Sequence, residues 1–506
     1  MTSRISDTIQ RSLRRLKILS NHMAVRRRIC SSLVDQSHHG PCITVTPSVG
    51  MVDEKVNFDI RGLVAKQIVT VVADVVENGM KFESWCVFQA DGNGEINNFS
   101  TESIHGTFKG IEPMGLFWSL RCVSAPKKYV RLVKKDVSTP MNFSIKVYPD
   151  NQNKATLMHQ PLTETSVQRL YKKPGVKRIP LAGKFKGTIF IPEGDGPFPG
   201  LIDMYGALVS LVETRAALLA SHGYATLALS YLYGEGLPDM VYDADFTYIK
   251  EAFEWFIKQD YIDKNRLGTV GISFGGLFSL VLASVFPQVR AAVDINGIPI
   301  TPEVNTIICD TADWLDKNKV FKAEEGIVIK NVYDCDNPWP VPVRFYFYFP
   351  KNERSRAIMT LLFNSNGTPL FNKDIQRTSF LAWQHGAKIL VIAGEDDQQM
   401  HPKWYTFYYD SCPPQFKANV KVYRYPGAGH MIEPPYIPNT RGVSPGRNRL
   451  RTVDFVPEKF YDEDMMVGGW PDKHAHAEED SWKKILNFLE ENVKHVSQED
   501  NPGGEF

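Results

Sequence analysis

The chain contains a serine in a setting that suits nucleophilic catalysis. The segment Gly271-Ile272-Ser273-Phe274-Gly275 matches the pattern G-x-S-x-G, in which a serine is raised on a sharp turn between a strand and a helix. The glycines leave room for the turn, and the helix N-terminus stabilises negative charge that develops in the reaction. A structural glycine-serine turn would match the bare pattern too. The flanks favour the nucleophile, because residues 267–272 are predicted to be a buried strand and 275–286 a helix.

A serine hydroxyl needs a general base, and His430 is the predicted base. The three residues of such a site follow the order serine, acid, histidine along the chain. His430 stands apart because it follows a predicted strand, residues 420–425, through the loop 426–429. Six of the other histidines lack this placement and are interpreted as ordinary surface or core residues: His105, His159, His385, His401, His474 and His476.

The acid that orients the base is expected between Ser273 and His430. Glu395, Asp396 and Asp397 directly follow an apolar strand predicted at residues 389–393. Asp397 is the first choice and Asp396 the second. Glu395 is interpreted as part of a solvated acidic turn.

Two backbone N–H groups must meet the oxyanion of such a reaction. One is expected from Phe274, which follows the nucleophile. The other is expected from the loop after the strand at residues 200–204, with Gly206 as the donor.

The elements that must position these residues alternate between strands and helices. Helices are predicted at 211–221, 244–258, 275–286 and 482–493, and strands at 187–191, 200–204, 224–230, 267–272, 291–296, 387–393 and 420–425. This pattern predicts an α/β fold, a parallel sheet with helices on both faces. Residues 300–381 interrupt the alternation and are predicted to be a lid or insertion.

The first part of the chain has a different pattern, with short strands separated by Gly, Asp and Asn. They are predicted at 43–47, 56–63, 68–77, 85–89, 115–120 and 142–148. Short strands at regular spacing predict an immunoglobulin-like β-sandwich. We therefore expect a basic tail at 1–40, a β-sandwich domain at 41–165, a catalytic α/β domain at 166–497 and a C-terminal tail at 498–506. A polar link is expected near residues 160–178.

Composition excludes several classes of function. The 506 residues carry a net charge of only +1, so no overall field favours nucleic acid. Seven scattered cysteines without a C-x-x-C spacing argue against a disulfide framework or a zinc site, and no run of about 20 apolar residues is present to span a membrane.

The basic, serine-containing residues 1–40 are typical of a mitochondrial transit peptide; the alternative is a disordered basic tail in a cytosolic protein.

Several segments, some of them long, resemble the type I acyl-CoA thioesterases and bile acid-CoA:amino acid N-acyltransferases. They are residues 106–116 (GTFKGIEPMGL), 197–204 (PFPGLIDM), 271–273, 394–397 (GEDD), 429–436 (GHMIEPPY) and the tail from Gly468-Gly469-Trp470-Pro471 to Trp482. The resemblance implies a β-sandwich before an α/β-hydrolase domain, with Asp397 as the acid. It also implies a fatty acyl-CoA substrate and no separate cofactor. The loop 205–210 and residues 300–381 depart from the family pattern.

The nucleophile separates the two activities of that family. Cysteine would form a thioester that amines attack readily, whereas Ser273 forms an oxygen ester that water can cleave. Hydrolysis to free fatty acid and CoA is therefore expected. Transfer to an amino acid, simple ester hydrolysis and non-catalytic acyl-CoA binding are the alternatives. The sequence does not determine the acyl chain length, the CoA-binding residues or the oligomeric state.

Overall fold

The computed structural model describes residues 40–125, 127, 129–150, 160–206, 209–239, 244–297, 321–323, 326–328, 382–399, 412–443 and 464–495. Three predictions lie largely outside these residues. They are the basic N-terminal tail with its mitochondrial address, the insertion at residues 300–381 and the C-terminal tail 498–506. All three stay predictions.

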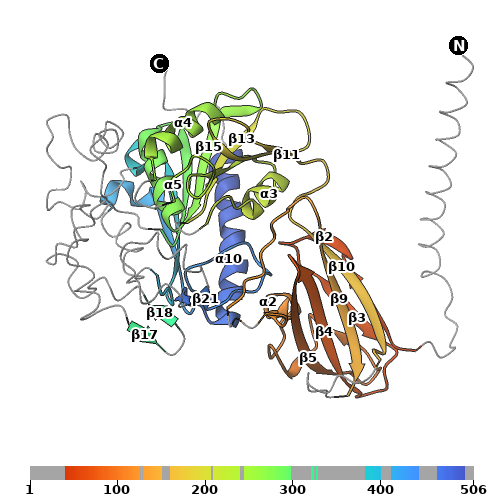
Figure 1. Ribbon diagram of the computed structural model, residues 1–506. Helices are drawn as coiled ribbons and strands as arrows, with labels where there is room; N and C mark the ends of the chain where they lie inside the picture. Colours follow the sequence, from red (N-terminus) through yellow and green to blue (C-terminus); the bar gives the residue numbers. More distant parts are fainter. Residues whose placement is uncertain are drawn as a thin grey trace, which may run out of the picture.

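The N-terminal part of the chain forms two β-sheets that share one hydrophobic core (Figure 1). The smaller sheet has the order β1-β3-β6, and the larger has β2-β10-β9-β4-β5-β7 with β8 beside β5. Buried and more exposed residues alternate along β9, as expected for a strand with one face on a core. The strands are β1 (Cys42–Thr46), β2 (Val49–Met51), β3 (Asn57–Arg61), β4 (Ile68–Glu77), β5 (Met80–Gln89), β6 (Ile96–Asn97), β7 (Ser103–Gly106), β8 (Arg121–Cys122), β9 (Met141–Pro149) and β10 (Thr163–Leu170). Their likeness to an immunoglobulin domain stays a prediction.

The strand predicted at residues 115–120 is wrong, because Gly115–Trp118 forms the short helix α2. All four residues of α2 are buried, so their apolar run has no periodicity that separates a strand from a helix. The helix is in contact with the β-sandwich. The Ser84 hydroxyl on β5 donates to the Leu116 carbonyl at 2.5 Å.

The link predicted near residues 160–178 is also wrong. It contains the strand β10, which crosses the predicted domain boundary at residue 165, and the start of β11 (Lys177–Pro180). β10 is antiparallel to β9 and parallel to β2. Only Val167 and Arg169 of β10 are buried. Its polar composition therefore does not indicate a strand, and backbone pairing with β9 and β2 holds it in the sheet.

The larger domain is built on an eight-stranded sheet in the order β11-β12-β14-β13-β15-β16-β19-β20. The pairs β11–β12 and β12–β14 are antiparallel and the other neighbours are parallel. The mostly parallel sheet confirms the α/β-hydrolase prediction. The further strands are β12 (Lys186–Ile191), β13 (Phe198–Met204), β14 (Ala225–Ser230), β15 (Ile262–Ile272), β16 (Val289–Ile295), β19 (Lys388–Gly394) and β20 (Val420–Tyr425).

Helices cover both faces of this sheet (Figure 1). Helices α3 (Thr214–Ser221) and α10 (Pro471–Leu489) share one core with the β-sandwich, while α4 (Phe246–Phe256) and α5 (Phe274–Val285) pack in a second core. Successive residues of β19 point to opposite cores, with Leu390 in the first and Val391 in the second. Short helical segments complete the domain: η5 (Ala382–His385), η6 (Pro414–Asn419) and the π-helical η8 (Glu490–Lys494). No helix among the described residues is both long and apolar enough to cross a membrane.

A small four-stranded sheet involves the predicted insertion. Its order is β17-β18-β22-β21, where β17 (Phe321–Ala323) and β18 (Gly326–Val328) come from the insertion. β21 (Gly442–Val443) and β22 (Met465–Met466) follow the last strand of the large sheet. β18 therefore pairs with β22 in the segment that leads into α10.

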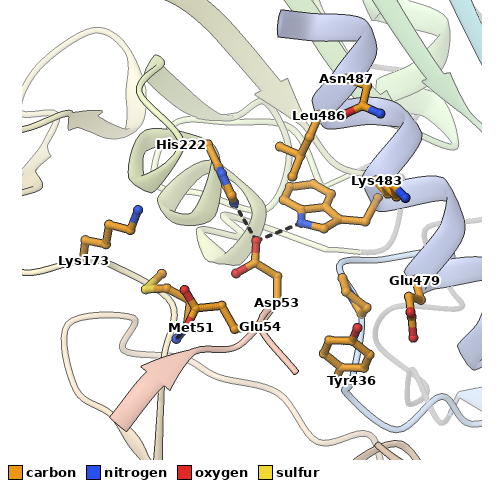
Figure 2. A pocket seen from close by; sticks show the side chains of 12 residues that line it. Met51, Asp53, Glu54, Lys173, His222, Tyr436, Glu479, Lys483, Leu486 and Asn487 are labelled. Atoms are coloured by element: carbon orange, nitrogen blue, oxygen red, sulfur yellow. Dashed lines mark hydrogen bonds and ion pairs between the residues drawn. The ribbon is translucent and has the colours of Figure 1, made fainter. Parts of the chain in front are cut away.

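The two domains meet at a buried carboxylate in the β-sandwich. Asp53 Oδ2 accepts a hydrogen bond from Trp482 Nε1 at 2.9 Å and lies 2.7 Å from His222 Nε2 (Figure 2). Burial works to raise the pKa of Asp53, but the hydrogen bond and charge of His222 and the bond from Trp482 bring it below its usual value. A cavity of about 280 Å³, lined by residues of both domains, lies beside this cluster. Asp53 thus joins the sandwich to α3 and α10.

We expect Asp53→Ala to lower the melting temperature by roughly 1–3 °C, since a buried donor left without an acceptor costs about 1–3 kcal/mol in a chain of this size. The variant leaves Trp482 Nε1 and His222 without their acceptor between the domains. Differential scanning calorimetry checks the shift. Glu95→Ala is the control, because Glu95 makes a 3.6 Å surface ion pair with Arg61 in the same domain, worth about 0–1 kcal/mol. Equal melting temperatures for the two variants would contradict the role of Asp53.

Candidate active site

Ser273 lies on a strained turn between β15 and α5. Its φ of 58° and ψ of −126° are uncommon for a residue with a side chain, and such strain persists only where the surroundings hold it. The Ser273 N–H donates to the Ile295 carbonyl at 2.8 Å. A methyl group on Gly271 would lie 2.0 Å from the Gly275 carbonyl oxygen, so this turn requires glycine. The structure therefore gives the G-x-S-x-G segment the strand-turn-helix setting that its sequence predicts.

The two predicted oxyanion donors flank Ser273. Phe274 is the first residue of α5, where backbone N–H groups lack partners within the helix. Gly206 follows β13, and a methyl group there would lie 3.2 Å from Ser273 Oγ. This loop therefore lies against the serine hydroxyl. Residues 207 and 208 lie outside the described residues, and the role of Gly206 as a donor stays a prediction.

His430 and Asp397 are joined by a buried hydrogen bond. Asp397 Oδ2 lies 2.7 Å from His430 Nδ1, and the Gln399 N–H donates to Asp397 Oδ1 at 2.7 Å. Asp397 is 0% exposed and His430 5%. A carboxylate on Nδ1 favours the tautomer whose Nε2 can accept a proton. The pair therefore has the chemistry of an oriented general base.

The neighbouring acids have other partners. Asp396 Oδ2 accepts hydrogen bonds from Arg441 Nη1 at 2.8 Å and from the Gly469 N–H at 2.9 Å. Glu395 lies 3.0 Å from Arg424 at the surface. Of the three acids that the sequence leaves open, Asp397 is the one that contacts His430.

A fourth acid, Asp294, lies at the end of β16. It is fully buried, and its Oδ1 accepts a hydrogen bond from the Gly297 N–H at 2.9 Å. Burial raises the pKa of Asp294 to about 7. Asp294 thus serves the turn after β16, whereas Asp397 serves the histidine.

Asn296 connects the loops that carry these residues, and the sequence interpretation missed it. Its side-chain N–H groups donate to the carbonyls of Gly429 at 3.0 Å and His430 at 2.7 Å. Its Oδ1 accepts from the Gly394 N–H at 2.7 Å. Asn296 directly follows Ile295, whose carbonyl holds Ser273. The available signal was a polar residue at the carboxyl end of a buried strand, where ligands of parallel sheets gather.

Parallel pairing brings the candidate residues to one edge of the sheet. β13, β15, β16, β19 and β20 run in the same direction, so their carboxyl ends lie together. Gly206, Ser273, Asn296, Asp397 and His430 each follow one of these ends. Four of the histidines that the sequence interpretation set aside lie within the described residues, and none of them follows a strand of this edge: His105, His385, His474 and His476.

Two family models match the chain. Residues 53–183 match "Acyl-CoA thioester hydrolase/BAAT N-terminal region", and residues 244–495 match "BAAT / Acyl-CoA thioester hydrolase C terminal". Together they cover most of the β-sandwich and most of the larger domain.

Individual relatives match over nearly their whole length. Acyl-coenzyme A amino acid N-acyltransferase 2 of Mus musculus is 33% identical over 461 residues, with 90% of this chain and 98% of that protein covered. Peroxisomal succinyl-coenzyme A thioesterase of Mus musculus is 31% identical, covering 86% and 93%. Acyl-coenzyme A thioesterase 5 of Mus musculus is 30% identical, covering 89% and 95%. On its fold, its site and these matches, the chain belongs to the acyl-CoA thioester hydrolase/BAAT family.

Proposed function

We propose that this protein hydrolyses fatty acyl-CoA thioesters to free fatty acid and CoA. Ser273 is the nucleophile, His430 the general base and Asp397 the acid that orients His430. The observation that carries the proposal is the 2.7 Å bond between Asp397 and His430, at the sheet edge where Ser273 sits on its strained turn. Thioesterases among the relatives of the chain support the same chemistry.

The proposed cycle has two halves. His430 accepts the Ser273 proton as Oγ attacks the thioester carbonyl, and the oxyanion faces the N–H groups of Phe274 and Gly206. The C–S bond then breaks, and His430 gives the proton to the CoA sulfur. In the second half His430 takes a proton from water, which attacks the acyl-serine ester. His430 returns that proton to Ser273 Oγ as the fatty acid leaves.

Transfer of the acyl group to an amino acid is the second candidate. The relative at 33% identity is named an amino acid N-acyltransferase, which favours this activity. The serine nucleophile favours hydrolysis, because an oxygen ester is less reactive toward amines than a thioester and needs the base to activate its attacker. A carboxylesterase and a non-catalytic acyl-CoA binder are further alternatives.

Product analysis tests the proposal. The intact protein is incubated with acyl-CoAs of increasing chain length, with and without glycine or taurine, while thiol release and acyl products are measured. We expect free fatty acid in all incubations with acyl-CoAs that are cleaved, and no dependence of thiol release on the amine. Acyl-amino acid as the main product would replace hydrolysis by transfer. Binding without thiol release, and without labelling by a fluorophosphonate, would indicate a non-catalytic binder.

A further inference from the structure

His474 contacts the backbone on both sides of His430. The ring lies on α10 and is fully buried. The Gly429 N–H donates to His474 Nδ1 at 2.9 Å, and His474 Nε2 lies 2.9 Å from the Met431 carbonyl oxygen. One imidazole thus spans the residue before the candidate base and the residue after it.

These contacts define the state of the His474 ring. An acceptor for the Gly429 N–H requires a lone pair on Nδ1, so the single ring proton is on Nε2. That proton faces the Met431 carbonyl, and Glu478 Oε1 lies 3.2 Å from the same nitrogen. Glu478 is itself buried, and burial raises its pKa to about 7. The contacts therefore use Nδ1 as an acceptor and Nε2 as a donor.

The loop is held from the opposite side as well. Asn296 donates to the carbonyls of Gly429 and His430, and the His430 N–H donates to the Val467 carbonyl at 2.7 Å. Both polar groups of the Gly429 residue thus have buried partners, one of them His474. With the backbone fixed, the position of the His430 ring depends on its side-chain torsions and on Asp397.

We propose that His474 is a positioning residue for the general base. It fixes the Gly429–Met431 backbone so that the His430 ring stays between Asp397 and Ser273. This inference rests on the proposed function, because it assigns His474 a part in the same reaction. A displacement of reacting groups by about 1 Å costs about 10²-fold in rate, which sets the size of the expected effect.

Three substitutions separate the two contacts. His474→Phe keeps a ring but removes both. His474→Asn places an oxygen near the position of Nδ1 and keeps an acceptor for the Gly429 N–H. His474→Gln places an amide near Nε2 and keeps a donor for the Met431 carbonyl. His495→Asn is the matched control, because the His495 side chain is 68% exposed and pairs with Glu490 in the preceding helical segment η8.

We expect kcat of His474→Phe to fall about 10²-fold with KM within 2-fold, and His474→Asn to retain activity within about 10-fold. The rate of Ser273 labelling by a fluorophosphonate should fall in parallel, and the low-field proton resonance of His430 Nδ1 should shift or broaden. Unchanged kcat and labelling in folded variants would overturn the inference. A loss of kcat and labelling that only matches the loss of folded protein, with an unchanged His430 resonance, would also overturn it. If His474→Phe does not fold, His474→Asn and His474→Gln are compared with the intact protein, and an unchanged kcat and labelling rate in both variants would overturn it.

Failure of the proposed function is distinguishable from failure of this inference. If no acyl-CoA is cleaved but the intact protein is labelled by the fluorophosphonate, the substrate is wrong, and the labelling rates of the His474 variants still test positioning. If the intact protein is not labelled, it has no base-activated serine, and both proposals fall.

Discussion

Ser273→Ala should lower kcat for acyl-CoA hydrolysis by about 10⁶-fold, because it removes the atom that forms the acyl intermediate. The effect should appear in kcat with little change in KM, since the substrate is bound by other groups. The alanine adds no atoms to the buried turn, whose backbone is held by the Ile295 carbonyl and by close glycine contacts. Thiol release with the best acyl-CoA of the panel is the measurement, together with fluorophosphonate labelling, which should disappear.

Ser284→Ala provides the matched control for this loss. Ser284 lies on the same helix α5, where its hydroxyl donates to the Leu280 carbonyl at 2.8 Å. We expect wild-type kcat from this variant. If Ser273→Ala retains kcat within 10-fold of the intact protein, the acyl-serine mechanism is wrong.

Asp397→Asn should lower kcat by about 10⁴-fold while the fold stays intact. The amide can donate a hydrogen bond to His430 Nδ1, which moves the ring proton to Nε2. The nitrogen that should accept the serine proton is then already protonated. Burial increases the effect, because Asp397 is 0% exposed and water cannot replace the lost carboxylate.

Asp396→Asn distinguishes the two adjacent acids. Asp396 accepts hydrogen bonds from Arg441 and from the Gly469 N–H, so this variant should lower the melting temperature. Its kcat should stay within about 10-fold of the intact protein, a smaller loss than that of Asp397→Asn. Calorimetry and thiol release on both variants separate stability from catalysis. A 10⁴-fold loss in Asp396→Asn with near-normal activity in Asp397→Asn would reverse the assignment.

The sequence predicted correctly those strands and turns whose structure is encoded by their own short segment. The turn at Ser273 is encoded by five consecutive residues between a buried strand and a helix, and the structure places it there. The strand at Ile68–Glu77 and the strand at Val420–Tyr425 also have the predicted bounds. In each case the hydrophobic pattern of the segment itself carries the information.

Predictions failed or stayed open for segments and side chains whose partners are distant in the sequence. The run at Gly115–Trp118 is apolar throughout, and it forms a helix whose Leu116 carbonyl accepts a hydrogen bond from the distant Ser84. The polar strand β10 exists through pairing with β9 and β2. The sequence also assigned His474 an ordinary role, although its ring contacts residues more than 40 positions away.

The sequence by itself predicted the α/β domain, the strand-turn-helix setting of Ser273 and the order in which the candidate serine, acid and histidine follow along the chain. The tertiary structure decided which carboxylate meets His430, and it added Asn296 and His474 to the support of that residue. The physical reason is the range of the interactions. Periodicity and turn chemistry act within about ten residues, whereas a hydrogen bond between a side chain and a loop depends only on distance in space. Adjacent acids such as Asp396 and Asp397 have the same local sequence, and only their partners differ.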